Sequence, residues 1–290
     1  MLIIEALSHV YPGGVKALND VSLTIGKGMF GLLGPNGAGK STLMRIIATL
    51  QAPSSGFVRF GEIDVLAHPE ALRRTLGYLP QDFGVYPRVS AQDMLDHMAV
   101  LKGVADRAER RAVVEGLLAQ VNLWDQRRRP LSGFSGGMRQ RFGIAQALIG
   151  APSLIIVDEP TAGLDPEERN RFLDLLAEIG ENVVVLLSTH IVADIADLCP
   201  AMAIICDGAI VRQGAPAGLI AGLEGRIWMK SVETAALPAV RAAHQVISTR
   251  LFSGRRVVHV LADCDPGDGF APAQGGLEDV YFSTLSARAA

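Results

Sequence analysis

The sequence has few cysteines, few aromatic residues and no long hydrophobic run. Cys199, Cys206 and Cys264 are the only cysteines among 290 residues, and they show neither CxxC spacing nor the density of a secreted disulfide scaffold. The strongest apolar runs, such as Val183 to Leu187, are four to six residues long, whereas a membrane span needs about 20. The opening MLIIEALSHVYPGG has no basic residues before its apolar stretch, so we expect no signal peptide. These absences favour a protein of a reducing compartment without a membrane span.

Charge of either sign is also modest. The chain has 27 Lys and Arg against 30 Asp and Glu, a net charge of -3 and a hydrophobic content of 49%. This apolar content excludes general disorder, because the chain can bury enough surface to offset the entropy lost on folding. The slight acidity argues against a surface that tracks nucleic acid, and we expect no nucleic-acid partner.

Short apolar runs alternate with helical patterns through the middle of the chain. A strand over Leu154 to Val157 precedes a predicted helix from Glu167 to Ile179, and a strand over Val183 to Leu187 follows. This alternation predicts a parallel sheet, and ligands bind at the carboxyl ends of such strands. Strands are also predicted near the N-terminus, over Leu2 to Leu7 and Val21 to Ile25.

Two segments depart from that alternation. Apolar residues from Ala91 to Leu123 recur three or four apart, which predicts helices inserted in a strand-rich chain. Beyond Gly222 the predicted strands resume, and a last helix is expected near Leu277. We therefore predict a first domain over residues 1–222, with a helical insert at about 85–135, and a C-terminal accessory domain over residues 223–290.

A glycine-rich loop joins the predicted strand Phe30 to Leu33 to a helix predicted over Lys40 to Leu50. Its sequence Gly-Pro-Asn-Gly-Ala-Gly-Lys-Ser matches the pattern G-x-x-x-x-G-K-[ST]. Backbone N–H groups of such a loop curl around phosphates, and the helix N-terminus adds its dipole. Lys40 is predicted to reach the β- and γ-phosphates of ATP, and Ser41 to hold Mg²⁺.

The strand Leu154 to Val157 ends in two carboxylates, Asp158 and Glu159. A strand running toward a phosphate site can present the first to the metal, so Asp158 is the expected Mg²⁺ partner of Ser41. Glu159 is then placed to polarise the attacking water. Taken alone, the pair also fits a helix N-cap followed by Pro160.

With these motifs the chain resembles the ATP-binding cassette ATPases of transporters. Ser135-Gly136-Gly137 is similar to the centre of the family's signature, although Phe134 and Met138 depart from its usual Leu and Gln. The Ser132-Gly133 pair just upstream is a second possible alignment. In the family this segment binds the γ-phosphate of ATP held by the opposite subunit.

Further residues gain roles from the resemblance. Gln81 resembles the glutamine that touches Mg²⁺ or water, and Gly163-Leu164-Asp165 the loop that communicates across the dimer. His190 resembles the histidine that contacts the γ-phosphate, and Tyr11 the aromatic residue that stacks on adenine. The implied catalytic set is Glu159, His190, Gln81 and Lys40, with Ser41, Gln81 and Asp158 at the metal. The implied nucleotide contacts are Tyr11, Gly34, Pro35, Asn36, Gly37, Ala38, Gly39, Lys40, Ser41, Thr42, Gln81, Ser135, Gly136, Gly137 and Asp165.

The resemblance implies an α/β fold with a P-loop NTPase core, an N-terminal antiparallel β subdomain, a helical insert and a small α+β extension. It also implies an ATP-hydrolysing subunit that drives a separate multi-span permease from the cytoplasmic face of the membrane. A homodimer, or a pair with a paralogous cassette, would form two composite ATP sites. The stretch Leu277 to Phe282 is similar to the C-terminal Leu-Glu-Asp-Val-Phe of ABC-2 exporters and favours export. The alternatives are an importer subunit, an ATPase acting on a ribosome or nucleic acid, and a regulatory module in which the tail is the functional part.

Overall fold

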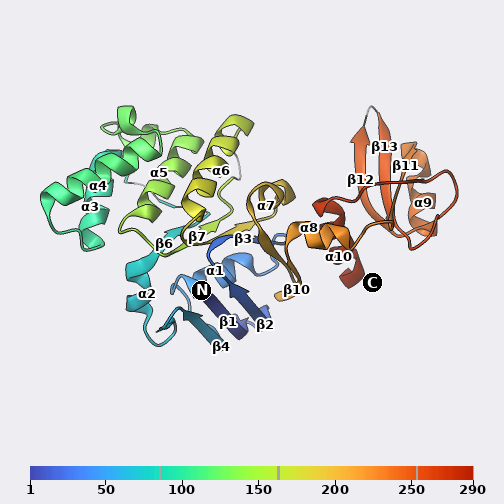
Figure 1. Cartoon of the computed structure of the whole chain (residues 1–290), viewed down its shortest axis with the longest axis horizontal. Helices are drawn as coiled ribbons and strands as arrows, with labels where there is room; N and C mark the ends of the chain where they lie inside the picture. The colour runs from blue at the N-terminus through green and yellow to red at the C-terminus, as the bar shows by residue number, and fades with distance from the viewer. Residues whose placement is uncertain (82, 85, 162–163, 253, 290) are drawn as a thin grey trace.

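The computed structural model describes residues 1–289 except 82, 85, 162–163 and 253 (Figure 1). The N-terminal strands form an antiparallel sheet of four strands in the order β2-β1-β4-β5. Its members are β1 (Leu2–Val10), β2 (Lys16–Ile25), β4 (Ser55–Phe60) and β5 (Ile63–Asp64). Alternation of buried and exposed residues along β2 is typical of a sheet with one face against the core.

A second sheet of six strands forms the centre of the molecule, in the order β10-β9-β3-β8-β7-β6. All neighbours are parallel except β9 and β10. Its strands are β3 (Gly28–Leu33), β6 (Leu76–Leu79), β7 (Leu154–Asp158), β8 (Val184–Thr189), β9 (Ala201–Cys206) and β10 (Ala209–Gly214). Leu33 pairs with Thr189, and Asp158 with Ser188, so the carboxyl ends of β3, β7 and β8 share one edge of the sheet.

Helices connect these strands and cover the sheet (Figure 1). They are α1 (Lys40–Ile47), α2 (Pro69–Thr75), α5 (Gly136–Leu148), α6 (Pro166–Gly180) and α7 (Val192–Leu198). All five residues of β7 and all six of β8 are buried, as expected for strands with both faces covered.

The helical insert consists of α3 (Ala91–Leu101) and α4 (Arg107–Gln120), followed by 3-10 turns at Trp124–Gln126 and Leu131–Gly133. Ser90 caps α3 through the N–H of Asp93, and Asp106 caps α4 through the N–H groups of Ala108 and Glu109. Figure 1 shows both helices at the end of the molecule remote from the C-terminal strands.

The C-terminal elements form a third sheet in the order β12-β13-β11-β14. They are α8 (Pro216–Ala221), β11 (Ile227–Val232), a 3-10 turn (Thr234–Ala236), α9 (Leu237–Ala243), β12 (Val246–Phe252), β13 (Arg255–Leu261), β14 (Ala271–Pro272) and α10 (Leu277–Ala289). Helix α10 contacts α7, α8 and β12, so it lies between the central sheet and this third sheet (Figure 1).

The fold class expected from the sequence is confirmed: a parallel core sheet, an N-terminal antiparallel sheet, inserted helices and an α+β extension. One predicted bound was wrong, because the helix expected to reach Leu50 ends at Ile47. Thr49 adopts a positive φ of 61°, which a right-handed helix cannot accommodate. The helical stretch from Ala91 to Leu123 is also interrupted between α3 and α4.

Candidate functional site

The glycine loop lies close against neighbouring strands. A Cβ added at Gly34 would lie 2.4 Å from the carbonyl oxygen of Ile205, and one at Gly39 would lie 2.4 Å from that of Ala17. Gly39 also has a φ of +104°, where a side chain is strained. The loop thus turns tightly into α1, whose first N–H groups have no partner within the helix. This is the backbone arrangement that holds phosphates.

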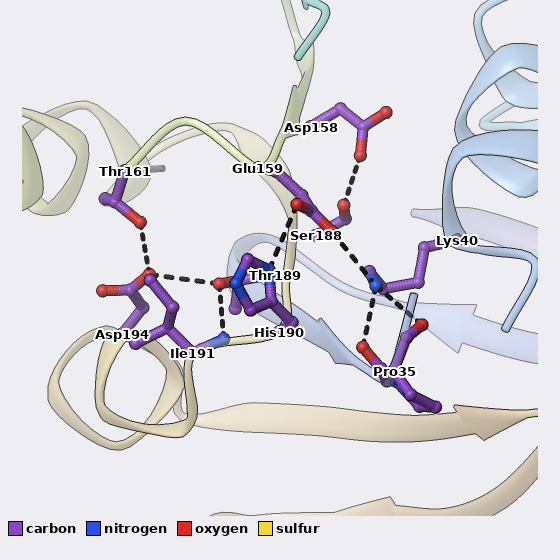
Figure 2. A network of polar contacts seen from close by, with 11 residues as sticks. Pro35, Lys40, Asp158, Glu159, Thr161, Ser188, Thr189, His190, Ile191 and Asp194 are labelled. Carbon is purple, nitrogen blue, oxygen red and sulfur yellow. Dashed lines mark hydrogen bonds and ion pairs between the residues drawn. The ribbon is translucent and has the colours of Figure 1, made fainter. Parts of the chain in front are cut away.

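Lys40 is buried beside this loop, with 4% of its surface exposed. Its Nζ donates to the carbonyl oxygens of Gly34 at 2.7 Å and Pro35 at 3.1 Å, and lies 3.1 Å from Oε1 of Glu159 (Figure 2). A buried ammonium needs such partners, because leaving water is costly for a charge. Lys40 therefore connects the glycine loop to the end of β7.

Glu159 lies at the centre of the polar network (Figure 2). Its backbone has a φ of +48°, and its N–H donates to the carbonyl of Ser188 at 2.9 Å. While Oε1 faces Lys40, Oε2 lies 3.1 Å from Nδ1 of His190. A non-glycine residue at positive φ is uncommon; here it turns the carboxylate toward the glycine loop.

Asp158 is buried at the end of β7 and accepts a hydrogen bond from the Ser188 hydroxyl on β8. No direct hydrogen bond joins it to Ser41 among the described residues. Its other carboxylate oxygen points away from the network in Figure 2. The carboxylate also helps to raise the pKa of Tyr78, after burial, which is the larger cause.

A pocket of about 710 Å³ lies over the loop. Nine residues that were predicted from the sequence to belong to the site line this pocket: Tyr11, Asn36, Gly37, Gly39, Lys40, Ser41, Thr42, Gln81 and Glu159. Lys16 and Arg45 line it too and were not predicted, since a single basic residue in a strand or helix gives no motif. The structure thus brings the adenine, phosphate and water-activating candidates to one cavity.

Tyr11 is fixed by its hydroxyl at one side of this pocket. The hydroxyl lies 3.1 Å from Oγ1 of Thr42, and Nη2 of Arg45 donates to it at 3.2 Å. Burial by itself would raise the pKa of Tyr11, but the hydrogen bonds with Thr42 and Gln51 and the charge of Arg45 lower it below its usual value. The His9 ring packs edge-on against the Tyr11 ring.

Ser135, Gly136 and Gly137 are not among the residues that line this pocket. Ser135 is the N-cap of α5 and accepts from the N–H of Met138 at 3.2 Å, whereas Ser132 lies in a 3-10 turn. A Cβ at Gly137 would lie 2.6 Å from the Glu168 carboxylate, so the helix start packs closely on α6. The structure therefore places this anion-binding candidate apart from the glycine loop of the same chain.

Asp165 is the N-cap of α6 and accepts from the N–H of Glu168 at 2.9 Å. It is exposed and does not line the pocket. Gly163 of the same predicted loop lies outside the described residues.

The site fits ATP and Mg²⁺. The loop backbone is held where a side chain at Gly34 or Gly39 would collide with its neighbours, and Lys40 supplies positive charge toward phosphates. Oxygen ligands are what Mg²⁺ prefers, and Ser41, Asp158 and Gln81 can offer them. Bound there, the ion would offset negative charge on the β- and γ-phosphates.

A profile described as ABC transporter matches residues 18–162. The chain is 39% identical over 204 residues to the ABC transporter ATP-binding protein NatA of Bacillus subtilis (strain 168), covering 69% of this chain and 82% of NatA. It is 32% identical over 264 residues to the daunorubicin/doxorubicin resistance ATP-binding protein DrrA of Streptomyces peucetius, covering 90% and 77%. It is 34% identical over 277 residues to the methionine import ATP-binding protein MetN of Bordetella pertussis, covering 92% and 75%.

Among solved structures, the ATP-binding cassette MJ0796 is similar in a dimeric, post-hydrolysis state bound to ADP and Pi. Its TM-score is 0.68 at 27% identity, over 74% of this chain and 98% of that chain.

Proposed function

Because this chain belongs to the ABC transporter family and is an ATP-binding and ATP-hydrolysing subunit, we propose that it drives a separate multi-span permease as a dimer with composite ATP sites. No helix among the described residues is long and apolar enough to cross a membrane. The permease would then hold the subunit at the cytoplasmic face.

Glu159 is the proposed general base. Its carboxylate would accept a proton from the water whose oxygen bonds to the γ-phosphorus, while the bond to the β–γ bridging oxygen breaks and ADP leaves. Lys40 and His190 each contact one of its oxygens at 3.1 Å, which fixes the carboxylate in orientation. His190, with 43% of its side chain exposed, can also reach a phosphate.

A second copy would complete each site. The N-terminus of α5, with Ser135 and the N–H groups of Gly136 and Gly137, is suited to a γ-phosphate but lies apart from the pocket of its own chain. Two equivalent half-sites favour a homodimer over a pair with a paralogous cassette. Asp165, exposed at the start of α6, would contact the other copy.

The observation that carries the permease proposal is a groove of about 560 Å³ between the helical insert and the core. Residues of α2, β6, α3 and α5 line it. Leu50 is 62% exposed and Leu101 72%, so large apolar side chains lie at the groove where a partner could cover them. Lys102 crosses from α3 to donate to the carbonyl oxygens of Arg73 and Leu76.

This groove is joined to the ATP pocket by one short strand. Gly77 and Tyr78 of β6 line the groove, and Gln81, two residues after that strand ends, lines the pocket. At about 3.3 Å per residue, the three residues from Tyr78 to Gln81 separate the two sites by roughly 10 Å of chain. A permease segment seated in the groove would therefore act on Gln81 through β6.

We further propose export, on the similarity of Leu277 to Phe282 to the tails of ABC-2 exporters. Import is the alternative, since the relative MetN is named an import protein. The permease, once identified, decides between them.

The test is affinity purification of tagged Glu159→Gln protein with ATP and Mg²⁺ from detergent-solubilised membranes of its own host. We expect a multi-span protein at a defined stoichiometry. Leu101→Glu in the groove should lose it, whereas Leu251→Glu should retain it, because Leu251 is 65% exposed but lies on β12.

Recovery only with ribosomes or nucleic acid would contradict the proposal and favour the alternative ATPase. If Leu101→Glu and Leu251→Glu lose the membrane protein equally, the permease proposal stands but the groove is contradicted as the docking site.

A further inference from the structure

We propose that Asp194, which does not line the ATP pocket, is a positioning residue that holds the segments carrying Glu159, His190 and Asp165 in one arrangement. The proposal rests on the roles given above to those three residues. Asp194 lies on α7 and is fully buried, so it acts through its neighbours and not on the nucleotide.

Both carboxylate oxygens of Asp194 have partners, and Figure 2 shows those of Oδ2. Oδ2 accepts from Oγ1 of Thr161 at 2.6 Å and from Oγ1 of Thr189 at 3.1 Å. Oδ1 lies 2.7 Å from Nε and 2.6 Å from Nη2 of Arg169. One side chain thus joins the segment after β7, the end of β8 and helix α6.

Each donor lies within four residues of a site residue in the chain. Thr161 is two residues after Glu159. Thr189 directly precedes His190, and its Oγ1 also accepts from the N–H of Ile191 at 2.9 Å, so the backbone is fixed on both sides of the histidine. Arg169 is one turn into α6, the helix that Asp165 caps.

A purely structural role would not require a carboxylate at this point. Helix α7 already packs closely on the core sheet, where a Cβ at Gly31 would lie 2.3 Å from Cδ1 of Ile195. Burying a charge is costly, and an apolar side chain would hold such a helix at least as well. The carboxylate is suited to something an apolar group cannot do, which is to bind donors from three separate segments at once.

The consequence is a link between the two copies of the dimer. Asp165 faces outward at the start of α6. A shift of α6 transmitted through Arg169 would move Asp194, and with it the threonines beside Glu159 and His190. Asp194 would thus make hydrolysis depend on the correct contact with the second copy.

The test compares Asp194→Asn with Asp197→Asn, an exposed acid on the same helix. For Asp194→Asn we expect kcat to fall by about 10- to 100-fold while KM for ATP stays within about twofold, because misplacement of catalytic groups acts on the chemical step. Asp197→Asn should keep the parental kcat. Fluorescent-nucleotide binding and Tm are measured on each protein.

Substitutions of Thr161 and Thr189 give a second, more conservative set of variants. Thr161→Val with Thr189→Val removes both hydroxyl donors and should lower kcat as Asp194→Asn does, while Thr161→Ser with Thr189→Ser keeps the donors and should restore most of it. Adding both valines to Asp194→Asn should cause little further loss, since all three substitutions act through the hydrogen bonds of the same carboxylate.

A folded Asp194→Asn protein with parental kcat, or with raised KM and unchanged kcat, would overturn the inference. If that variant does not fold, equal kcat in the valine and serine pairs would overturn it instead. Glu159→Gln is run beside them: parental turnover there would contradict the proposed role of Glu159, which is a separate failure.

Discussion

Buried polar groups gather in two regions that differ in what they face. At the carboxyl edge of the central sheet, Lys40 and Glu159 are buried yet line the ATP pocket. On α10, Ser283 and Thr284 donate to the carbonyl of Val280 in their own helix, and Asp279 lies 2.8 Å from Nδ1 of His259. The first region keeps charge beside an opening, whereas the second satisfies its polar groups internally. Burial of charge alone therefore does not identify a reactive site; access to a cavity does.

From this contrast between the two regions, we expect the largest effect on ATP turnover from a substitution of Glu159. Glu159→Gln should lower kcat by about 10²- to 10⁴-fold, or about 3 to 5 kcal/mol of barrier, because the amide cannot accept the proton of the attacking water. ATP binding should persist, since the glycine loop and Lys40 are unchanged. Steady-state turnover and nucleotide binding on the same protein check this, and parental turnover would remove Glu159 from the chemistry.

A second prediction is that the ATP pocket of one chain is only half of a catalytic site, which α5 of the second copy completes. Lys40→Met and Ser135→Arg should each be inactive alone. When the two are mixed in equal amounts, half of the dimers pair the two variants and have one intact site, so about a quarter of parental activity should return. The measurement is ATPase rate against mixing ratio. No gain on mixing would mean that each chain hydrolyses ATP without its partner's α5.

The smallest effect is expected on α10. Asp279→Asn should lower the free energy of unfolding by about 1–3 kcal/mol by weakening the partly buried hydrogen bonds from His259 and the N–H of Gly276. ATP turnover should change by less than about twofold. Asp263→Asn, which loses the exposed pair with Arg226, is the control and should cost less than about 1 kcal/mol.

The Asp279 effect should depend on pH in a defined direction. Burial alone would raise the pKa of Asp279, but the hydrogen bonds with His259 and Gly276 lower it below its usual value of 3.8. A lowered pKa in the folded state stabilises the fold above pH 3.8, and this contribution is lost as pH falls through the folded-state value. Urea unfolding at pH 7 and pH 3 should show the gap between parent and variant shrinking at the lower pH. A gap that widened would contradict this assignment.

The features that could be predicted from the sequence are local in the chain. The glycine loop, the Asp158-Glu159 pair and the serine before two glycines are each contained in a few consecutive residues. Parallel topology then gathers strand ends at one edge, which is why the positions of Lys40 and Glu159 in one pocket could be anticipated.

Other features depend on contacts between distant residues. Asp194 meets Thr161 across 33 positions, and it lies on a seven-residue helix too short for a clear apolar period. The strand β2 begins at Lys16, whereas the predicted strand began at Val21. The first part was missed because Asp20, with a φ of 54°, bends the strand and interrupts the apolar alternation there. The shared carboxylate and the bend both arise from tertiary packing that no single segment encodes.

The brevity of β6 has a mechanical consequence. This strand has only four residues, Leu76 to Leu79, and it is hydrogen-bonded to β7 along its whole length. It therefore has little freedom to deform when a partner in the groove displaces it. A displacement of β6 at the groove would thus be passed on to Gln81. The same stiffness makes the segment intolerant of length change: one inserted residue would turn Tyr78 and its neighbours to the opposite face. The strand is therefore constrained in length, and also in composition, since a Cβ at Gly77 would lie 2.3 Å from the carbonyl oxygen of Ala147.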